Sequence, residues 1–213
     1  MAGVFITFEG TEGAGKSTQV RLLAARLRAA GHGVRGLREP GGTAVGEAIR
    51  ELVKHRAGPG LAPEAELLLM NASRAQLVRE VIRPALAAGE VVVCDRFLDS
   101  TTAYQGHGRG LDLGMVRAVI DAAVGPTRPD LTLWLTLPAA AATARLAARD
   151  AGGDRFEAEG REFFERVETG YAAIAAAEPG RVVAVSAEGT PAEVADRVWA
   201  AVEPLWAVPG RDR

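Results

Sequence analysis

Cysteine is nearly absent from the 213-residue sequence, and the single Cys94 excludes a framework of disulfide bonds within the chain. A lone cysteine fits a reducing compartment. Neither sign of charge is in excess, because 25 basic and 27 acidic residues leave a formal net charge of −2, which does not favour nucleic acid as a partner. The opening residues, MAGVFITFEG, show neither the basic segment of a signal peptide nor an apolar run of membrane-spanning length. We expect a cytoplasmic protein without a nucleic-acid or membrane partner.

Lysine is the second scarcity, because only Lys16 and Lys54 occur among the 25 basic residues. Lys16 lies in the stretch GTEGAGKST, residues 10–18, which fits the pattern G-x-x-x-x-G-K-[ST]. In this pattern backbone N–H groups surround phosphate oxygens, the lysine adds charge near the β- and γ-phosphates, and the hydroxyl, here that of Ser17, ligands Mg²⁺. We predict a site for a nucleoside triphosphate formed by Gly10, Thr11, Glu12, Gly13, Ala14, Gly15, Lys16, Ser17 and Thr18.

The segments on either side of this stretch support the prediction. VFITFE at 4–9 has the apolar, β-branched and aromatic composition of a buried strand, and the segment after the stretch has apolar residues at helical spacing up to Gly31. A strand, a loop and a helix N-terminus together form the arrangement that binds phosphate. The alternative is a glycine-rich turn with an accidental lysine, which this context disfavours.

Short apolar segments alternate with helical patterns along the chain. The predicted strands are 4–9, 34–38, 91–94, 131–137 and 181–185, and the predicted helices lie near 16–30, 43–55, 64–88, 112–124, 139–150, 157–177 and 191–206. This alternation indicates an α/β fold in which a parallel sheet is covered by helices on both faces. Ligands of such sheets bind beyond the carboxyl ends of the strands.

Two polar stretches follow predicted strands, REPGGT at 38–43 and DRFLDSTTAYQG at 95–106, and we expect both to be short loops. Asp95 follows the apolar run VVVC, and a carboxylate there can hold Mg²⁺ through water. Arg96 can bind a phosphate through two hydrogen bonds. The alternative is an Asp–Arg pair that caps the next segment.

Three further features each leave two interpretations open. Glu12 would repel a triphosphate, unless it accepts a hydrogen bond from a sugar hydroxyl of a second substrate; otherwise it is a solvated side chain. Met70 and Arg74 share one helix face and can hold a flat base, although methionine at helical spacing is usually core and arginine usually solvated. The segment RLAARDAGGDRFE at 145–157 is either a glycine-hinged lid that carries arginines to the triphosphate or a solvated basic loop.

Taken together, GTEGAGKS, REPGGT, the helix ending in SRAQLV and DR-x₃-S-x₃-YQG occur in an order and spacing that resembles the bacterial thymidylate kinases, which are nucleoside monophosphate kinases of the P-loop class. The resemblance covers nearly all of residues 1–206. It implies one three-layer P-loop kinase domain with a five-stranded parallel sheet flanked by helices, a small arginine-bearing lid at about 145–157, and a homodimer. It also implies transfer of the γ-phosphoryl group from ATP to dTMP with Mg²⁺. We expect residues 207–213 to be a disordered tail.

The resemblance also implies roles for individual residues. Residues 10–18 would bind ATP, Ser17 and Asp95 would hold the metal, and the residues that bind dTMP would be Glu12, Arg38, Met70, Arg74, Arg96, Ser100, Thr101 and Tyr104. Within that set Glu12 would face the 3′-hydroxyl group and Tyr104 would exclude ribonucleotides. The catalytic residues would be Lys16, Arg96, Arg149 and Arg155.

Two positions distinguish this chain within the resemblance. One branch of the family has an arginine where this chain has Gly13, whereas the other branch supplies arginines from the lid; this chain resembles the second branch. The family commonly has phenylalanine where this chain has Met70, which packs on a ring more softly.

Three rival functions are weighed against this interpretation. A kinase for another nucleoside monophosphate is disfavoured only by the analogy of Tyr104 and Arg74. A GTPase switch would carry N-K-x-D, which the sequence lacks, and DAGG at 150–153 matches D-x-x-G without a preceding apolar strand. A DNA-processing ATPase would carry a basic stripe, and the absence of one from the sequence argues against this function.

Overall fold

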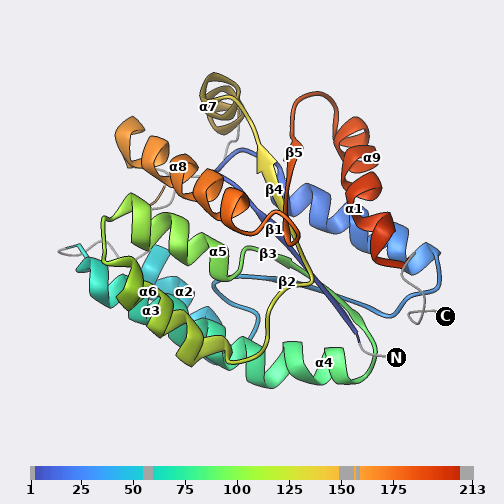
Figure 1. Cartoon of the computed structure of the whole chain (residues 1–213), viewed down its shortest axis with the longest axis horizontal. Helices are drawn as coiled ribbons and strands as arrows, with labels where there is room; N and C mark the ends of the chain where they lie inside the picture. Colours follow the sequence, from blue (N-terminus) through green and yellow to red (C-terminus); the bar gives the residue numbers. More distant parts are fainter. Residues whose placement is uncertain (1–2, 55–59, 149–155, 157–158, 207–213) are drawn as a thin grey trace.

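The structure is a computed structural model that describes residues 3–54, 60–148, 156 and 159–206. Its centre is a parallel sheet of five strands in the order β2-β3-β1-β4-β5 (Figure 1). The strands are β1 (Val4–Glu9), β2 (Val34–Arg38), β3 (Val91–Asp95), β4 (Leu131–Thr136) and β5 (Val182–Ser186). The five predicted strands are therefore confirmed, with β1 and β2 matching at both ends and the other three shifted by one residue at one or both ends.

Helices cover both faces of this sheet (Figure 1). They are α1 (Lys16–Ala29), α2 (Ala44–Lys54), α3 (Pro63–Leu77), α4 (Arg83–Ala87), α5 (Leu98–Thr101), α6 (Leu113–Val124), α7 (Ala139–Ala147), α8 (Arg161–Ala177) and α9 (Pro191–Val202), joined by the π-helical turns η1 (Val78–Ile82) and η2 (Thr102–Gly108) and the 3₁₀ turn η3 (Glu203–Trp206). None of the helices among these described residues is both long and apolar enough to cross a bilayer.

The alternation of side chains along β1 explains the three layers. Ile6 and Phe8 pack with residues of α1 and α9, whereas Phe5, directly before Ile6, packs with residues of α3, η1 and α6 on the other face. Successive side chains of a strand point to opposite faces, so one buried strand serves two cores. A third cluster fills the space between η2 and α8, where Tyr104, Phe163 and Tyr171 meet.

The segment after β3 is the clearest difference from the sequence-based expectation. We expected a short polar loop at 95–106, whereas the structure contains α5 and η2 there. The polar side chains that suggested a loop are satisfied by distant residues: Asp99 accepts two hydrogen bonds from Arg181, at 2.7 and 2.8 Å. π-Helical turns occur frequently at functional sites.

The predicted helix at 64–88 is also interrupted by a wider turn, η1. The interruption precedes Pro84, which has no N–H group to donate to the carbonyl four residues earlier.

The parallel arrangement brings three charged strand ends to one edge of the sheet. Phe8 is in register with Asp95, and Asp95 is in register with Arg38 of β2. Glu9 is the last residue of β1 and is buried. The loops that follow these strands therefore meet at this edge of the sheet.

Candidate active site

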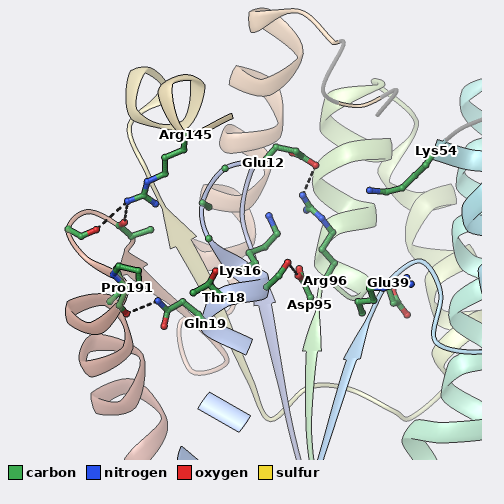
Figure 2. Close-up of a pocket in the computed structure, with 18 of the residues that line it drawn as sticks. Glu12, Lys16, Thr18, Gln19, Glu39, Lys54, Asp95, Arg96, Arg145 and Pro191 are labelled. Atoms are coloured by element: carbon green, nitrogen blue, oxygen red, sulfur yellow. Dashed lines mark hydrogen bonds and ion pairs between the residues drawn. The ribbon is translucent and has the colours of Figure 1, made fainter. Parts of the chain in front are cut away.

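A cavity of about 730 Å³ lies beyond the carboxyl ends of β1, β2 and β3 (Figure 2). Its wall combines the loop after β1, basic residues after β2 and β3, and a separate patch from α7 and the start of α9. The lining residues are Glu12, Gly13, Ala14, Gly15, Lys16, Ser17, Thr18, Gln19, Arg38, Glu39, Arg50, Lys54, Asp95, Arg96, Arg145, Ala187, Gly189, Pro191 and Val194. The structure thus brings the predicted phosphate loop together with Arg38, Asp95 and Arg96.

The glycines of the loop are required by its backbone. Gly13 has φ 80°, and a Cβ atom there would lie 2.8 Å from the carbonyl oxygen of Ala142 in α7. Gly15 has φ 89° and directly precedes α1. Side chains at these positions would strain the backbone or displace α7. A longer side chain at position 13 is therefore incompatible with this packing of α7.

Lys16 begins α1 and points into the loop, as Figure 2 shows. Its Nζ atom donates hydrogen bonds to the carbonyl oxygens of Gly10 at 2.9 Å and Thr11 at 2.8 Å. Burial and the nearby guanidinium of Arg96 lower the pKa of Lys16 from 10.5 to about 8, against the opposing effect of Glu12 and Asp95. The ammonium group is thus held where it lacks solvent and would gain from an added anion.

Ser17 and Asp95 form the predicted metal pair. The Ser17 hydroxyl donates to a carboxylate oxygen of Asp95 at 2.5 Å. A hydroxyl and a carboxylate are oxygen ligands of the type that Mg²⁺ prefers. Across the described ranges no three His, Cys, Asp or Glu side chains are grouped so that they could hold a metal. The pair therefore fits a cation whose remaining ligands come from phosphate and water.

Arg96 is the centre of a partly buried polar network. Its guanidinium donates to Glu12 at 2.7 Å, to the Tyr104 hydroxyl at 3.0 Å and to Ser100 at 3.1 Å. The Tyr104 hydroxyl in turn donates to Glu12. Burial lowers the pKa of Arg96, but Glu12 and the other oxygen groups outweigh it and raise that pKa well above the usual value. The network fixes a permanent positive charge beside the phosphate loop.

Two further arginines stand on the β2 side of the cavity. Arg38 donates to Glu47 at 2.9 Å and to the Pro40 carbonyl at 3.1 Å. Arg50 donates to the same carbonyl at 2.9 Å. Together with Arg96 they give this end of the cavity three guanidinium groups, an arrangement suited to a phosphate. Sequence reasoning did not single out Arg50, although it lies one helical turn after Glu47, the partner of Arg38.

Arg74 lies behind this wall and not in the cavity. It is 1% exposed, and its guanidinium contacts Glu39, Asn71, Thr101 and the Phe97 carbonyl at 2.7–2.9 Å. Four of these contacts are hydrogen bonds, and the fifth is an ion pair between Nη2 and Glu39 at 2.7 Å. Glu39 keeps one buried carboxylate oxygen without a hydrogen bond. Burial raises the pKa of Glu39 to about 7, against the effect of Arg74.

The remaining predicted residues are distributed as follows. Ser100 is buried next to Arg96, and Thr101 is buried next to Arg74. Met70 packs at the edge of the cluster that contains Tyr104 and does not line the cavity. Arg149 and Arg155 lie outside the residues that the structure describes, as does most of the predicted lid at 145–157.

Sequence reasoning counted Arg145 only among the arginines of the predicted lid at 145–157 and did not identify Glu9 or Tyr171. Arg145 donates to the carbonyl oxygens of Ala187 at 2.9 Å and Gly189 at 3.4 Å, and so joins α7 to the far wall of the cavity. Glu9 and Tyr171 are buried under Arg96. Glu9 carries the signal that identified Asp95, namely a charge at the end of an apolar strand. No local signal identifies Tyr171, which comes from α8.

Comparisons with known proteins agree with this geometry. The family model described as thymidylate kinase matches residues 8–198. The chain is 56% identical to the thymidylate kinase of Synechococcus sp. (strain JA-2-3B'a(2-13)), covering 94% of this chain and 95% of the relative. It is 54% identical to that of Pseudomonas fluorescens (strain Pf0-1), covering 88% and 89%.

Among solved structures, the chain is similar to a crystal structure of thymidylate kinase from Ehrlichia chaffeensis. The TM-score is 0.76 at 32% identity, and the match covers 95% of this chain and 99% of that one. The match of the family model and the identity over nearly the whole chain lead to one conclusion: the chain belongs to the thymidylate kinase family.

Proposed function

We propose that the chain transfers the γ-phosphoryl group of ATP to dTMP, giving ADP and dTDP. Membership of the thymidylate kinase family supports this reaction. The observation that carries the proposal at the level of residues is that Lys16 and Arg96 face one cavity, Lys16 from the start of α1 and Arg96 from the residue after β3. A single phosphate loop suffices to bind a triphosphate; a partly buried arginine opposite it serves a second phosphate.

The phosphate loop would bind ATP. Its backbone N–H groups and Lys16 would hold the phosphates, because the helix N-terminus and the ammonium both favour negative charge. Ser17 would ligand Mg²⁺ directly and Asp95 would hold it through water, and the cation would neutralise phosphate charge. The patch formed by Gln19, Arg145 and Pro191 lies beside the loop and would receive the nucleoside of ATP.

The opposite wall would bind dTMP. Arg96, with Arg38 and Arg50, would hold its phosphate. Glu12 would accept a hydrogen bond from the 3′-hydroxyl group, and this hydrogen bond offsets the repulsion between Glu12 and the phosphates. Tyr104 would lie against the sugar and exclude a 2′-hydroxyl group.

The base would lie against a set of residues behind the phosphate wall, namely Met70, Arg74, Ser100 and Thr101. Because the guanidinium of Arg74 already makes four hydrogen bonds and an ion pair within the protein, a thymine carbonyl would have to share its N–H donors with these partners. Met70 would have to turn from the cluster of Tyr104 towards the ring.

Catalysis would consist of alignment and charge neutralisation. The acceptor phosphate is already ionised at neutral pH, so no general base is needed. Arg96 would direct an oxygen of the acceptor phosphate at the γ-phosphorus, and Lys16 would neutralise the charge that spreads over the transferred group. Arg149 and Arg155 would add positive charge from the lid, where an arginine is worth about 10³–10⁵ in rate.

We further propose that the protein is a cytoplasmic homodimer. Exposed apolar side chains gather on three helices, of which α2 and α6 each pack against α3: Val45, Leu52, Leu68, Leu113 and Met115. A second copy would cover this face, since apolar patches of this kind mark interaction surfaces.

Arg96→Ala tests the assignment of the two binding sites. Without Arg96 we expect kcat/KM for dTMP to fall by at least about 10²-fold, the effect expected of a lost positioning group. The Kd of a fluorescent ATP analogue should change less than threefold, because Arg96 does not contact the backbone of the phosphate loop. Arg21→Ala, an exposed position on α1, is the control. Normal turnover in Arg96→Ala at low dTMP would remove Arg96 from the acceptor site.

A further inference from the structure

Arg96 has an unusual backbone. It is the only residue other than glycine with positive φ among those the structure describes, at 71°. A non-glycine residue in this region pays a conformational cost, and such costs persist only where surrounding contacts impose the conformation. The contacts that impose it here come from the end of β1.

The first of these contacts fix the backbone on both sides of Arg96. The N–H group of Arg96 donates to the Phe8 carbonyl at 2.9 Å. The next N–H group, that of Phe97, donates to one carboxylate oxygen of Glu9 at 2.8 Å. The bend at Arg96 is therefore held by two consecutive residues of the strand that leads into the phosphate loop.

The second carboxylate oxygen of Glu9 fixes the side chain. It accepts hydrogen bonds from the Ser100 hydroxyl at 2.5 Å and the Tyr171 hydroxyl at 2.8 Å. Each of these hydroxyls accepts from the Arg96 guanidinium, at 3.1 and 3.3 Å. Because each hydroxyl donates its proton to Glu9, its lone pairs stay directed at Arg96.

We propose that Glu9 is a positioning residue for Arg96: one buried carboxylate fixes both the bent backbone and the guanidinium direction of the arginine that would hold the acceptor phosphate. The inference rests on the proposed function. Glu9 itself is 0% exposed, does not line the cavity and touches no substrate in this account. Its effect on the reaction passes through Arg96.

Burial alone would not require a carboxylate here. A buried charge is costly unless it is hydrogen-bonded, and Glu9 accepts three hydrogen bonds from separate segments. A glutamine has only one acceptor oxygen, so Glu9→Gln keeps the size of the side chain but cannot accept from both the Phe97 N–H group and the hydroxyls. The substitution therefore loosens one arm of the support without creating a cavity.

The experiment is a double-mutant cycle between Glu9→Gln and Arg96→Ala, with kcat/KM for dTMP as the readout. In the wild-type background we expect Glu9→Gln to lower kcat/KM by about 10²-fold, the effect of a roughly 1 Å misplacement. In the Arg96→Ala background the same change should lower it less than threefold. The Kd of the fluorescent ATP analogue should stay within threefold throughout.

A control separates positioning from stability. Asp130 accepts the Phe5 N–H group at 2.8 Å, at the opposite end of β1. Asp130→Asn should lower the melting temperature but leave kcat/KM within threefold. If Glu9→Gln does not fold, Tyr171→Phe removes one hydroxyl of the same support; it should lower kcat/KM several-fold in the wild-type background and have no effect in Arg96→Ala.

The two ideas fail in different ways. If dTMP does not stimulate ADP release by the wild-type protein, the proposed function fails. If dTMP does stimulate it and the losses from Glu9→Gln and Arg96→Ala multiply, or Glu9→Gln is fully active, the inference about Glu9 is overturned.

Discussion

Lys16 should take up a proton when ATP binds near pH 8. In the protein by itself, burial and Arg96 lower its pKa from 10.5 to about 8. At about 1.4 kcal/mol per pKa unit, charging this ammonium in the folded protein costs about 3 kcal/mol. A bound triphosphate places negative charge against Nζ. This charge offsets the effects of burial and Arg96, so the pKa of Lys16 rises.

The magnitude follows from the two protonation states. At pH 8 about half of the molecules carry neutral Lys16, so ATP binding should take up about half a proton per molecule. At pH 6.5, where Lys16 is already charged, this uptake should vanish. Titration calorimetry in two buffers of different ionisation enthalpy measures the number of protons, and Lys16→Met, tested at saturating ATP, corrects for protons from other groups.

The same shift gives a prediction for stability. The folded pKa lies below that of the unfolded chain, so between pH 8 and 10.5 the unfolded chain binds more protons. The contribution of Lys16 to the free energy of unfolding should therefore increase by up to about 3 kcal/mol as pH rises from 8 to 10.5. The same contribution should be lost as pH falls from 10.5 to 8. Urea unfolding should therefore give free energies of unfolding whose pH dependence differs between wild type and Lys16→Met. Equal pH dependence in both proteins, together with no proton uptake on ATP binding, would refute the buried, destabilised ammonium.

Three other changes test separate parts of the account. Tyr104→Ala should admit ribonucleotide acceptors, and an absence of ribonucleotide activity in acceptor assays of this variant would contradict the exclusion of ribonucleotides by Tyr104. Tyr104→Phe should still exclude ribonucleotides but should lower kcat/KM for dTMP at least tenfold, because the hydroxyl bonds to charged Glu12 and Arg96. Asp95→Asn should raise the Mg²⁺ concentration needed for half-maximal rate by about 10–100-fold, and an unchanged requirement would exclude Asp95 from the metal site. Leu68→Glu, at a side chain that is 58% exposed, should convert a dimer to a folded monomer by light scattering; an unchanged mass would place the interface elsewhere.

The phosphate loop and its flanking strand and helix could be predicted from the sequence because their contacts are local. Gly10 to Gly15 form one loop that leads directly into α1, and β1 carries an apolar run that ends where the loop begins. The proximity of Arg96 to this loop followed from the rule that parallel strands end at the same edge. The register of Phe8 with Asp95 confirms that expectation.

The segment after Asp95 could not be predicted in the same way. Its polar residues look like a loop until their partners are known, and those partners lie far away in the chain: Arg181 for Asp99, and Glu9 for Ser100. The burial of Arg74 could not be predicted from its helix either. Helical spacing placed it on one face with Met70, but its burial depends on Glu39, Thr101 and the Phe97 carbonyl, which only the fold brings to it.

The most direct test of phosphoryl transfer to dTMP is the release of ADP from Mg-ATP without an acceptor, and then with dTMP, dUMP, dCMP, dGMP and UMP in turn. We expect a low rate without an acceptor, strong stimulation by dTMP and much weaker stimulation by UMP, because the guanidinium groups and Tyr104 would form an acceptor site for a deoxynucleotide. A rate of ADP release that is the same with and without every acceptor would contradict this expectation.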